Sequence, residues 1–223
     1  MRRIQDKRTN VVLLGRFNPA IFQPAWFVRH GLLRQEEGVD EDQQQGADVR
    51  VVHPEVTEFA TEWLVVQILK ERFQARPTRD GHDEEVRDLV LGTFRLLRHT
   101  PVETLGINTT AHWVMDSEEQ WNRLGDVLAP KDVCWGEVME KPGLRSLIMH
   151  GTRSEGPKGH VLVRVEPSSK DRFGVFVEIN DHYEVNAPQE CLGAEEVLGL
   201  LETRWSASQE QAERVIARLV GMP

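Results

Sequence analysis

The stretch 159–185 constrains the fold most strongly, because apolar and polar side chains alternate along it in two runs. The apolar members occupy every second position: Val161, Val163, Val165, Val175, Val177 and Ile179. Successive side chains of a β-strand point to opposite faces, so each run predicts a strand with one buried face. The polar segment between the runs suits a hairpin turn. We therefore predict paired strands over 159–167 and 173–185.

The rest of the chain extends this pattern to an α+β fold. Further strands are predicted over 10–17, 48–53, 56–63, 64–75, 103–115 and 144–152. Helices are predicted over 84–98 with Asp83 as N-cap, after Ser117, and over 194–220 with a break near 206–208. The run Ser-Glu-Glu-Gln from Ser117 is a capping box, which marks the start of the second helix. We expect an antiparallel sheet covered on one face by helices.

The 223 residues suit a single compact domain, 1–223. The tripeptide Glu-Glu-Val opens a helical segment at 84–86 and again at 195–197. This short repeat is compatible with an alternative in which the chain consists of two similar β-rich halves, 10–100 and 101–223, each ending in a helix. The polar and acidic stretch 34–48 is expected to be an exposed loop.

The net charge of −9 argues against nucleic-acid binding, which draws much of its affinity from neutralised phosphates. There is no signal peptide and no apolar run long enough to span a membrane, so we expect a cytoplasmic protein with reduced thiols. The two cysteines, Cys134 and Cys191, lie far apart and form no zinc-ligand spacing. We expect no cofactor.

The polar face of the predicted hairpin is the first candidate site. It carries His160, Arg164, Glu178, Asn180 and His182. A strand over 105–114 in the same sheet would add Asn108, Thr110 and His112. Such a platform could hold a polar ligand or position a water for hydrolysis. The simpler interpretation is a solvated sheet face with cross-strand ion pairs.

Catalysis and metal binding receive less support. Asp181 and His182 are adjacent on a strand and point to opposite faces, so they cannot form a relay. His150 and His160 could lie close together, but two histidines without a third ligand make a poor metal site. No nucleophile motif and no phosphate-binding loop is present, so we predict neither a catalytic residue nor a metal site.

A tandem pentapeptide, NPAIF followed by QPAWF at 18–27, supplies the second candidate site. Prolines five residues apart exclude a continuous helix or a central strand here. The simplest interpretation docks the large apolar side chains in the core. The sharper hypothesis is a partner-binding patch on proline turns, which would present Phe17, Ile21, Phe22, Trp26 and Phe27 to a protein partner.

Four stretches resemble conserved bacterial proteins of unknown function: FNPAIFQPAWF, LGINTTAHW, EKPGLRSL and VRVEPS with GVFVEINDHYE. They are similar, more distantly, to a sporadically distributed bacterial family whose central strand reads GLRYIN. LGIN at 105–108 matches that motif loosely, with Thr109 in place of the aromatic residue. The chain also resembles the SecB-like export-chaperone fold, although it is longer than one such domain. This resemblance implies an antiparallel sheet covered by long helices.

These observations favour a non-catalytic protein that binds a protein partner or itself, as an oligomer or as an accessory subunit of a bacterial multi-protein system. Two alternatives stay open. One is a SecB-like chaperone that holds apolar segments. The other is a small hydrolase or ligand-binding enzyme that uses the polar sheet face.

Overall fold

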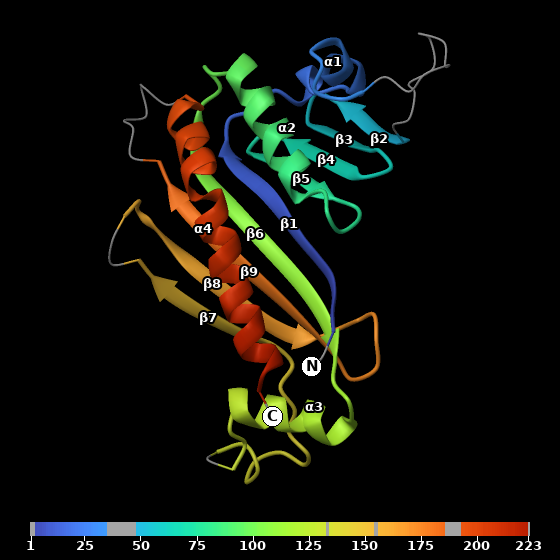
Figure 1. Cartoon of the computed structure of the whole chain (residues 1–223), viewed down its shortest axis with the longest axis vertical. Helices are drawn as coiled ribbons and strands as arrows, with labels where there is room; N and C mark the ends of the chain where they lie inside the picture. The colour runs from blue at the N-terminus through green and yellow to red at the C-terminus, as the bar shows by residue number, and fades with distance from the viewer. Residues whose placement is uncertain (1–2, 35–47, 133, 154–155, 186–192, 223) are drawn as a thin grey trace.

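The computed structural model describes residues 3–34, 48–132, 134–153, 156–185 and 193–222. One nine-stranded antiparallel sheet runs through the molecule in the order β2-β3-β4-β5-β1-β6-β9-β8-β7 (Figure 1). The expected α+β class with an antiparallel sheet is therefore confirmed. The strands are β1 (Ile4–Gly15), β2 (Asp48–His53), β3 (Val56–Ala60), β4 (Leu64–Leu69), β5 (Arg72–Pro77), β6 (Val102–Val114), β7 (Leu147–Thr152), β8 (Gly159–Pro167) and β9 (Gly174–Glu184).

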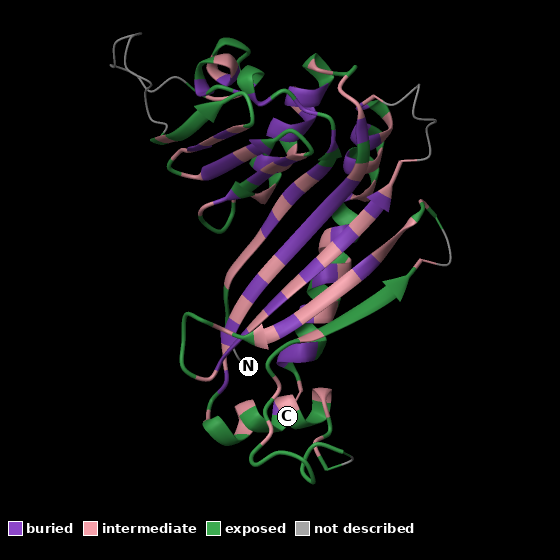
Figure 2. Cartoon of the chain, turned by 180° about the vertical axis from the view of Figure 1, so that it is seen from behind, coloured by how far each residue is buried: buried purple, intermediate pink, exposed green. Residues whose placement is uncertain are grey.

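Helices cover one face of this sheet and its two ends. They are η1 (Pro19–Ile21), α1 (Pro24–Arg29), α2 (Asp83–Leu96), α3 (Glu118–Leu128) and α4 (Glu195–Val220). α2 packs on β1 and β5, and α4 packs on β6 and β9 and against α2. In Figure 1, α1 lies beside β2 and β3 at one end, and α3 lies at the opposite end. Figure 2 shows the molecule from behind, and no helix among the described residues covers the other face of β1, β6, β9 and β8.

The two halves of the chain have a similar strand order, although the first has five strands and the second has four. In the first half β1 lies at the centre of the sheet, and β5, β4, β3 and β2 follow outward in reverse chain order. In the second half β6 takes the central place, and β9, β8 and β7 follow outward in the same way. Each half ends in a helix on the same sheet face, α2 or α4. The hypothesis of an internal duplication stays a prediction, and this similar strand order is the pattern it would produce.

Several element boundaries differ from those expected. The region 56–75 holds three strands instead of two, because Lys70 and Glu71 form a tight turn between β4 and β5. α4 is continuous through 206–208, where a break was predicted. His82 precedes α2 as its N-cap residue, and Asp83, predicted for that place, is the first helical residue. Ser117 does cap α3: its hydroxyl accepts a hydrogen bond from the Gln120 amide at 3.2 Å.

The core between sheet and helices has two apolar parts. The larger part lies under α2 and the first turns of α4, and it contains six phenylalanines: Phe17, Phe22, Phe27, Phe59, Phe73 and Phe94. The smaller part lies under the last turns of α4 and against α3, and it is built on Trp113, Val177 and Ile216. The predicted acidic loop 34–48 falls, apart from its end residues, outside the described part of the chain.

A layer of buried hydrogen-bonded groups lies between the two apolar parts, and we call it the polar layer. Asp181 on β9 accepts a hydrogen bond from the Tyr183 hydroxyl at 2.7 Å, accepts another from Ser208 of α4 and forms an ion pair with Arg153. The Arg153 guanidinium also lies over the Tyr183 ring, 3.9 Å from its centroid. Burial lowers the pKa of Arg153. Asp181 and Ser208 are each 3% exposed, so this charge is neutralised inside the protein.

The polar layer continues across the centre of the sheet through Thr9. Its hydroxyl hydrogen-bonds Thr109 at 3.0 Å and Gln209 of α4 at 3.2 Å. Its amide donates to the Asp83 carboxylate at 2.9 Å. Burial raises the pKa of Asp83, and the hydrogen bonds from Thr9 oppose that rise. Asp83 thus joins the first turn of α2 to β1.

Candidate functional site

The structure brings the predicted polar platform together on the sheet face that carries no helix, which we call the open face. His160 lies directly opposite His182 in the pairing of β8 with β9, and Arg164 lies opposite Glu178. Asn180 lies between His182 and Glu178 on β9 and opposite Asn108 of β6. All five platform side chains are half-buried. Buried and half-buried residues alternate along these strands in Figure 2. As predicted, Asp181 points to the opposite face.

Arg164 and Glu178 form a cross-strand ion pair within this platform. Arg164 donates to the Glu178 carboxylate from Nη2 at 2.6 Å and from Nε at 3.1 Å. Its guanidinium also lies 5.4 Å from the centroid of the Phe176 ring. Because charge and hydrogen-bonding capacity are satisfied within the protein, this pair fits the simpler interpretation of the face. It leaves Glu178 poorly placed to act as a base.

Three imidazoles form a stack beside that pair. The ring centroids of His150 and His160 are 5.0 Å apart, and those of His160 and His182 are 4.5 Å apart. Burial and the neighbouring His160 lower the pKa of His182, in that order of importance. The neutral form of His182 is therefore favoured, which keeps a nitrogen lone pair available.

Glu184 completes a set of potential metal ligands with two of these histidines. One ligand atom each from His160, His182 and Glu184 lies within 4.8 Å of the other two. Glu184 follows His182 by two positions on β9, so both side chains stand on the open face. Its Oε2 also lies 3.2 Å from the Lys158 ammonium. The sequence did suggest that His150 and His160 are close, but it did not identify this third ligand.

Two unsatisfied amide oxygens lie next to the histidines. Asn108 is 9% exposed, and its Nδ2 donates to Asn10 at 3.2 Å. The Oδ1 atoms of Asn108 and Asn180 are buried without a hydrogen-bond partner. They converge on the space above Gly106, where an added Cβ would lie 3.3 Å from one oxygen and 3.6 Å from the other. Gly106 is the strand partner of His182, so this space adjoins the imidazole.

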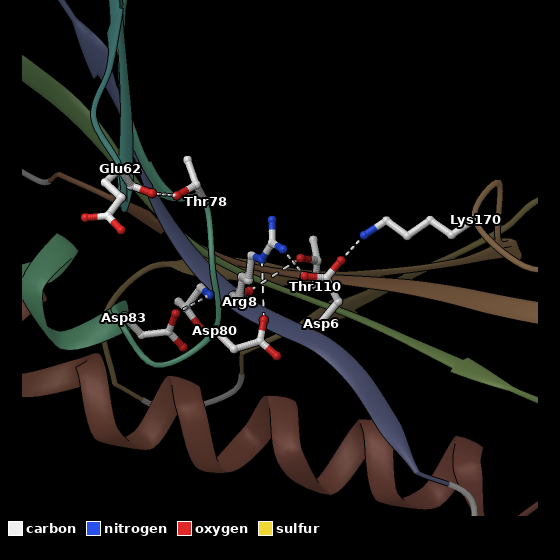
Figure 3. A network of polar contacts seen from close by, with 9 residues as sticks. Asp6, Arg8, Glu62, Thr78, Asp80, Asp83, Thr110 and Lys170 are labelled. Carbon is white, nitrogen blue, oxygen red and sulfur yellow. Dashed lines mark hydrogen bonds and ion pairs between the residues drawn. The ribbon is translucent and has the colours of Figure 1, made fainter. Parts of the chain in front are cut away.

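A charged network surrounds the first half of β1 (Figure 3). Asp6 adopts φ = 56° at a bulge in β1 and pairs with both Arg8 and Lys170. Arg8 also reaches Asp80 at 3.4 Å. Each cation in the network faces a carboxylate, and the side chains are partly exposed, so we assign the network to positioning of β1.

His112, the third side chain expected from β6, lies near this network. Its Nδ1 is 2.9 Å from the Ser168 hydroxyl, and its ring packs on Phe176 with centroids 4.9 Å apart. Burial, and secondly the positive charge of Arg8, lowers the pKa of His112. Thr110, also expected on this face, donates to the Arg8 carbonyl at 3.4 Å.

The tandem pentapeptide is folded into the larger apolar part, and this corrects most of the second site prediction. Phe17, Phe22 and Phe27 are 7%, 1% and 0% exposed, so they cannot contact a partner while the protein is folded. Each proline starts a short helical turn, η1 or α1, and the turns direct the rings inward. Ile21 is 37% exposed, and Trp26 is half-buried against the same core.

The most exposed apolar side chains lie instead in the segment 135–149. Val138 is 70% exposed, and the others above 45% in this segment are Ile148, Met149, Met139 and Trp135. Ile148 and Met149 belong to β7, the last strand of the sheet, which is exposed along its length in Figure 2. Within the described ranges no strand pairs with the outer edge of β7. We call β7 the apolar edge.

Comparison with known proteins identifies no relative. No protein-family model, no curated protein and no solved structure matches the chain. In the described part of the chain, no helix is long and apolar enough to cross a membrane. The resemblance to the GLRYIN-containing family and to the SecB-like fold therefore stays a prediction.

Proposed function

We propose that this chain is a non-catalytic interaction protein and that it associates with a second copy of itself through the apolar edge. The observation that carries this proposal is the position of Ile148 and Met149, which are 62% and 58% exposed on an unpaired edge strand. The proposal keeps the protein–protein function expected from the sequence and moves its contact surface from 17–27 to β7.

The two edges of the sheet differ in a way that supports this choice. β2, at the other edge, has charged Asp48 and Arg50, a register shift and an ion pair from Arg50 to Glu58 at 2.7 Å. Charged side chains and bulges are the features that protect edge strands from pairing with other chains. β7 reads Leu-Ile-Met-His-Gly-Thr, without an acidic or basic residue other than His150, and its pairing with β8 is regular. The edge β7 therefore lacks the protection that β2 has.

A second copy of this chain is the simplest binding partner for the unprotected edge strand β7. Two identical edge strands related by a twofold axis pair antiparallel, and each supplies the backbone donors and acceptors that the other needs. Ile148 and Met149 are adjacent on β7 and so lie on opposite faces of the sheet. Self-pairing would cover both side chains, whereas packing on one face would cover only one of them.

Light scattering coupled to size exclusion tests the proposal over a range of protein concentrations. We expect a mass of twice 25.5 kDa for the parent chain and a monomer for Ile148→Lys/Met149→Lys. Leu96→Lys is the matched control, because Leu96 is 51% exposed at the end of α2, away from β7. Circular dichroism should show that both variants are folded.

A parent chain that is monomeric at all concentrations would refute self-association. If that monomer suppressed aggregation of an unfolded test protein, and the β7 variant did not, the SecB-like alternative would replace our proposal. A dimer that persists in the folded β7 variant would place the contact surface elsewhere and also refute the proposal.

A further inference from the structure

We infer that His160, His182 and Glu184 form a binding site for one divalent first-row transition metal ion of the zinc type. This site lies on the open face and does not depend on the proposed self-association. The inference replaces the expectation from sequence that the chain has no metal site. It starts from the proximity of the three ligand atoms, each within 4.8 Å of the others.

The backbone fixes the spacing of these three side chains. His160 and His182 are directly opposite in a regular antiparallel pair, and Glu184 is two positions further along β9. Ligands that surround one zinc ion at about 2.0–2.2 Å in tetrahedral geometry lie ~3.3 Å apart. Binding of one ion therefore requires the donor atoms to approach by up to about 1.5 Å, with the stacked rings of His160 and His182 turning about their side-chain torsions toward it.

The donor set determines the class of metal. Two imidazole nitrogens with one carboxylate oxygen suit Zn²⁺ and its neighbours, whereas Mg²⁺ and Ca²⁺ prefer oxygen ligands only. The Lys158 ammonium lies 3.2 Å from Oε2 of Glu184, and the Lys158 side chain is 71% exposed. The ammonium can turn into solvent at little cost, so it does not block the carboxylate.

Three protein ligands leave a fourth position for water or a small ligand. The Oδ1 atoms of Asn108 and Asn180 lie near Gly106, on the other side of His182 from Glu184, so we do not include them in the site. His150 stacks on the other side of His160, at 5.0 Å between ring centroids.

Isothermal titration of chelator-treated protein tests the site, with Zn²⁺ as the probe and Mg²⁺ as the comparison ion. We expect one Zn²⁺ per chain and no binding of Mg²⁺. His160→Ala, His182→Ala and Glu184→Gln should each weaken Zn²⁺ binding by at least about tenfold, since even loss of an outer contact to a metal ligand has an effect of that size. His99→Ala, at an exposed histidine beyond α2, should bind Zn²⁺ like the parent chain.

A second measurement separates loss of a ligand from loss of the fold. Glu184→Gln keeps the shape of a side chain that is 43% exposed, so this variant should stay folded. Co²⁺ bound to the parent chain should show the visible absorption of four-coordinate cobalt, and the folded Glu184→Gln variant should lose or shift it. The inference is overturned if the parent chain binds no Zn²⁺, or if all three variants bind it as tightly as the parent.

Discussion

The sharpest test of the core is the replacement of Phe22 by alanine, with its neighbour Ile21 as the control. Phe22 is 1% exposed, and its ring centroid lies 5.7 Å from that of Phe73 and 6.2 Å from that of Phe94. It also contacts Trp26 and Phe27 of the second pentapeptide. Removal of a buried phenylalanine side chain costs about 3–5 kcal/mol, because apolar contacts are lost and a cavity remains.

The expected change is large enough to measure by thermal unfolding. For a chain of this length each kcal/mol corresponds to about 2–4 °C in Tm, so Phe22→Ala should lower Tm by roughly 6–20 °C. Ile21→Ala removes a side chain that is 37% exposed, and its effect should stay below about 1.5 kcal/mol. Circular dichroism during heating, together with urea unfolding, gives both numbers. Equal stability of the two variants would show that the tandem pentapeptide does not belong to the core.

Two further predictions concern the polar layer and the histidines. Arg153→Met leaves the Asp181 carboxylate buried without its cation, and we expect a loss of about 3–5 kcal/mol in the free energy of unfolding. Adding Asp181→Asn should recover part of that loss. An Arg153→Met variant as stable as the parent chain would contradict this role. The folded-state pKa values of His112 and His182 lie below the ordinary 6.5, so the unfolded chain binds protons first as the pH falls. The free energy of unfolding should therefore be highest above pH 6.5 and should decrease as the pH falls below 6.5 toward the lowered pKa values of the folded state. The decrease should be smaller in the His112→Gln/His182→Gln variant. Urea unfolding at several pH values measures this dependence, and an unchanged dependence in the variant would refute the assignment.

The open face was predictable from the sequence because strand periodicity decides it. Val161 and Val177 set one face of β8 and β9, and His160, Asn180 and His182 follow on the other. The same period places Glu184 beside His182, so the third metal ligand was present in the pattern. A carboxylate at the end of a strand is also typical of a solvated position, so the pattern alone does not single out Glu184 as a ligand.

The tandem pentapeptide was not predictable in the same way. A proline at the start of a short turn fixes the local backbone, but it does not determine whether the following rings face the sheet or solvent. That choice depends on contacts distant in sequence, such as the hydrogen bond from Thr57 to the Pro19 carbonyl at 2.8 Å. The exposure of Ile148 also depends on tertiary structure, because β7 is the last strand of the sheet and its neighbour there is β8.

The predicted helix break near Ser208 is wrong: serine favours such breaks when its hydroxyl bonds to nearby backbone groups, and Ser208 does not do so here. In the structure its hydroxyl faces Asp181 and Tyr183 inside the protein, and α4 continues past it. The burial of a polar residue on a helix can be predicted only when its hydrogen-bond partner on the sheet is known.

That contact has a consequence for the alignment of α4 along the sheet. Buried residues recur on this helix every three or four positions, from Leu201 and Trp205 to Ala212 and Ile216, and Ser208 is the buried polar member of the series. A slide of the helix by one turn would keep an apolar stripe on the sheet but would place Trp205 or Ala212 against the Asp181 carboxylate. The buried carboxylate would then lose the hydrogen bond from Ser208, and the loss of a hydrogen bond to a buried charge makes such a slide costly. The polar layer thus fixes the position of α4 along the sheet, because the hydrophobic pattern alone would allow several positions one turn apart.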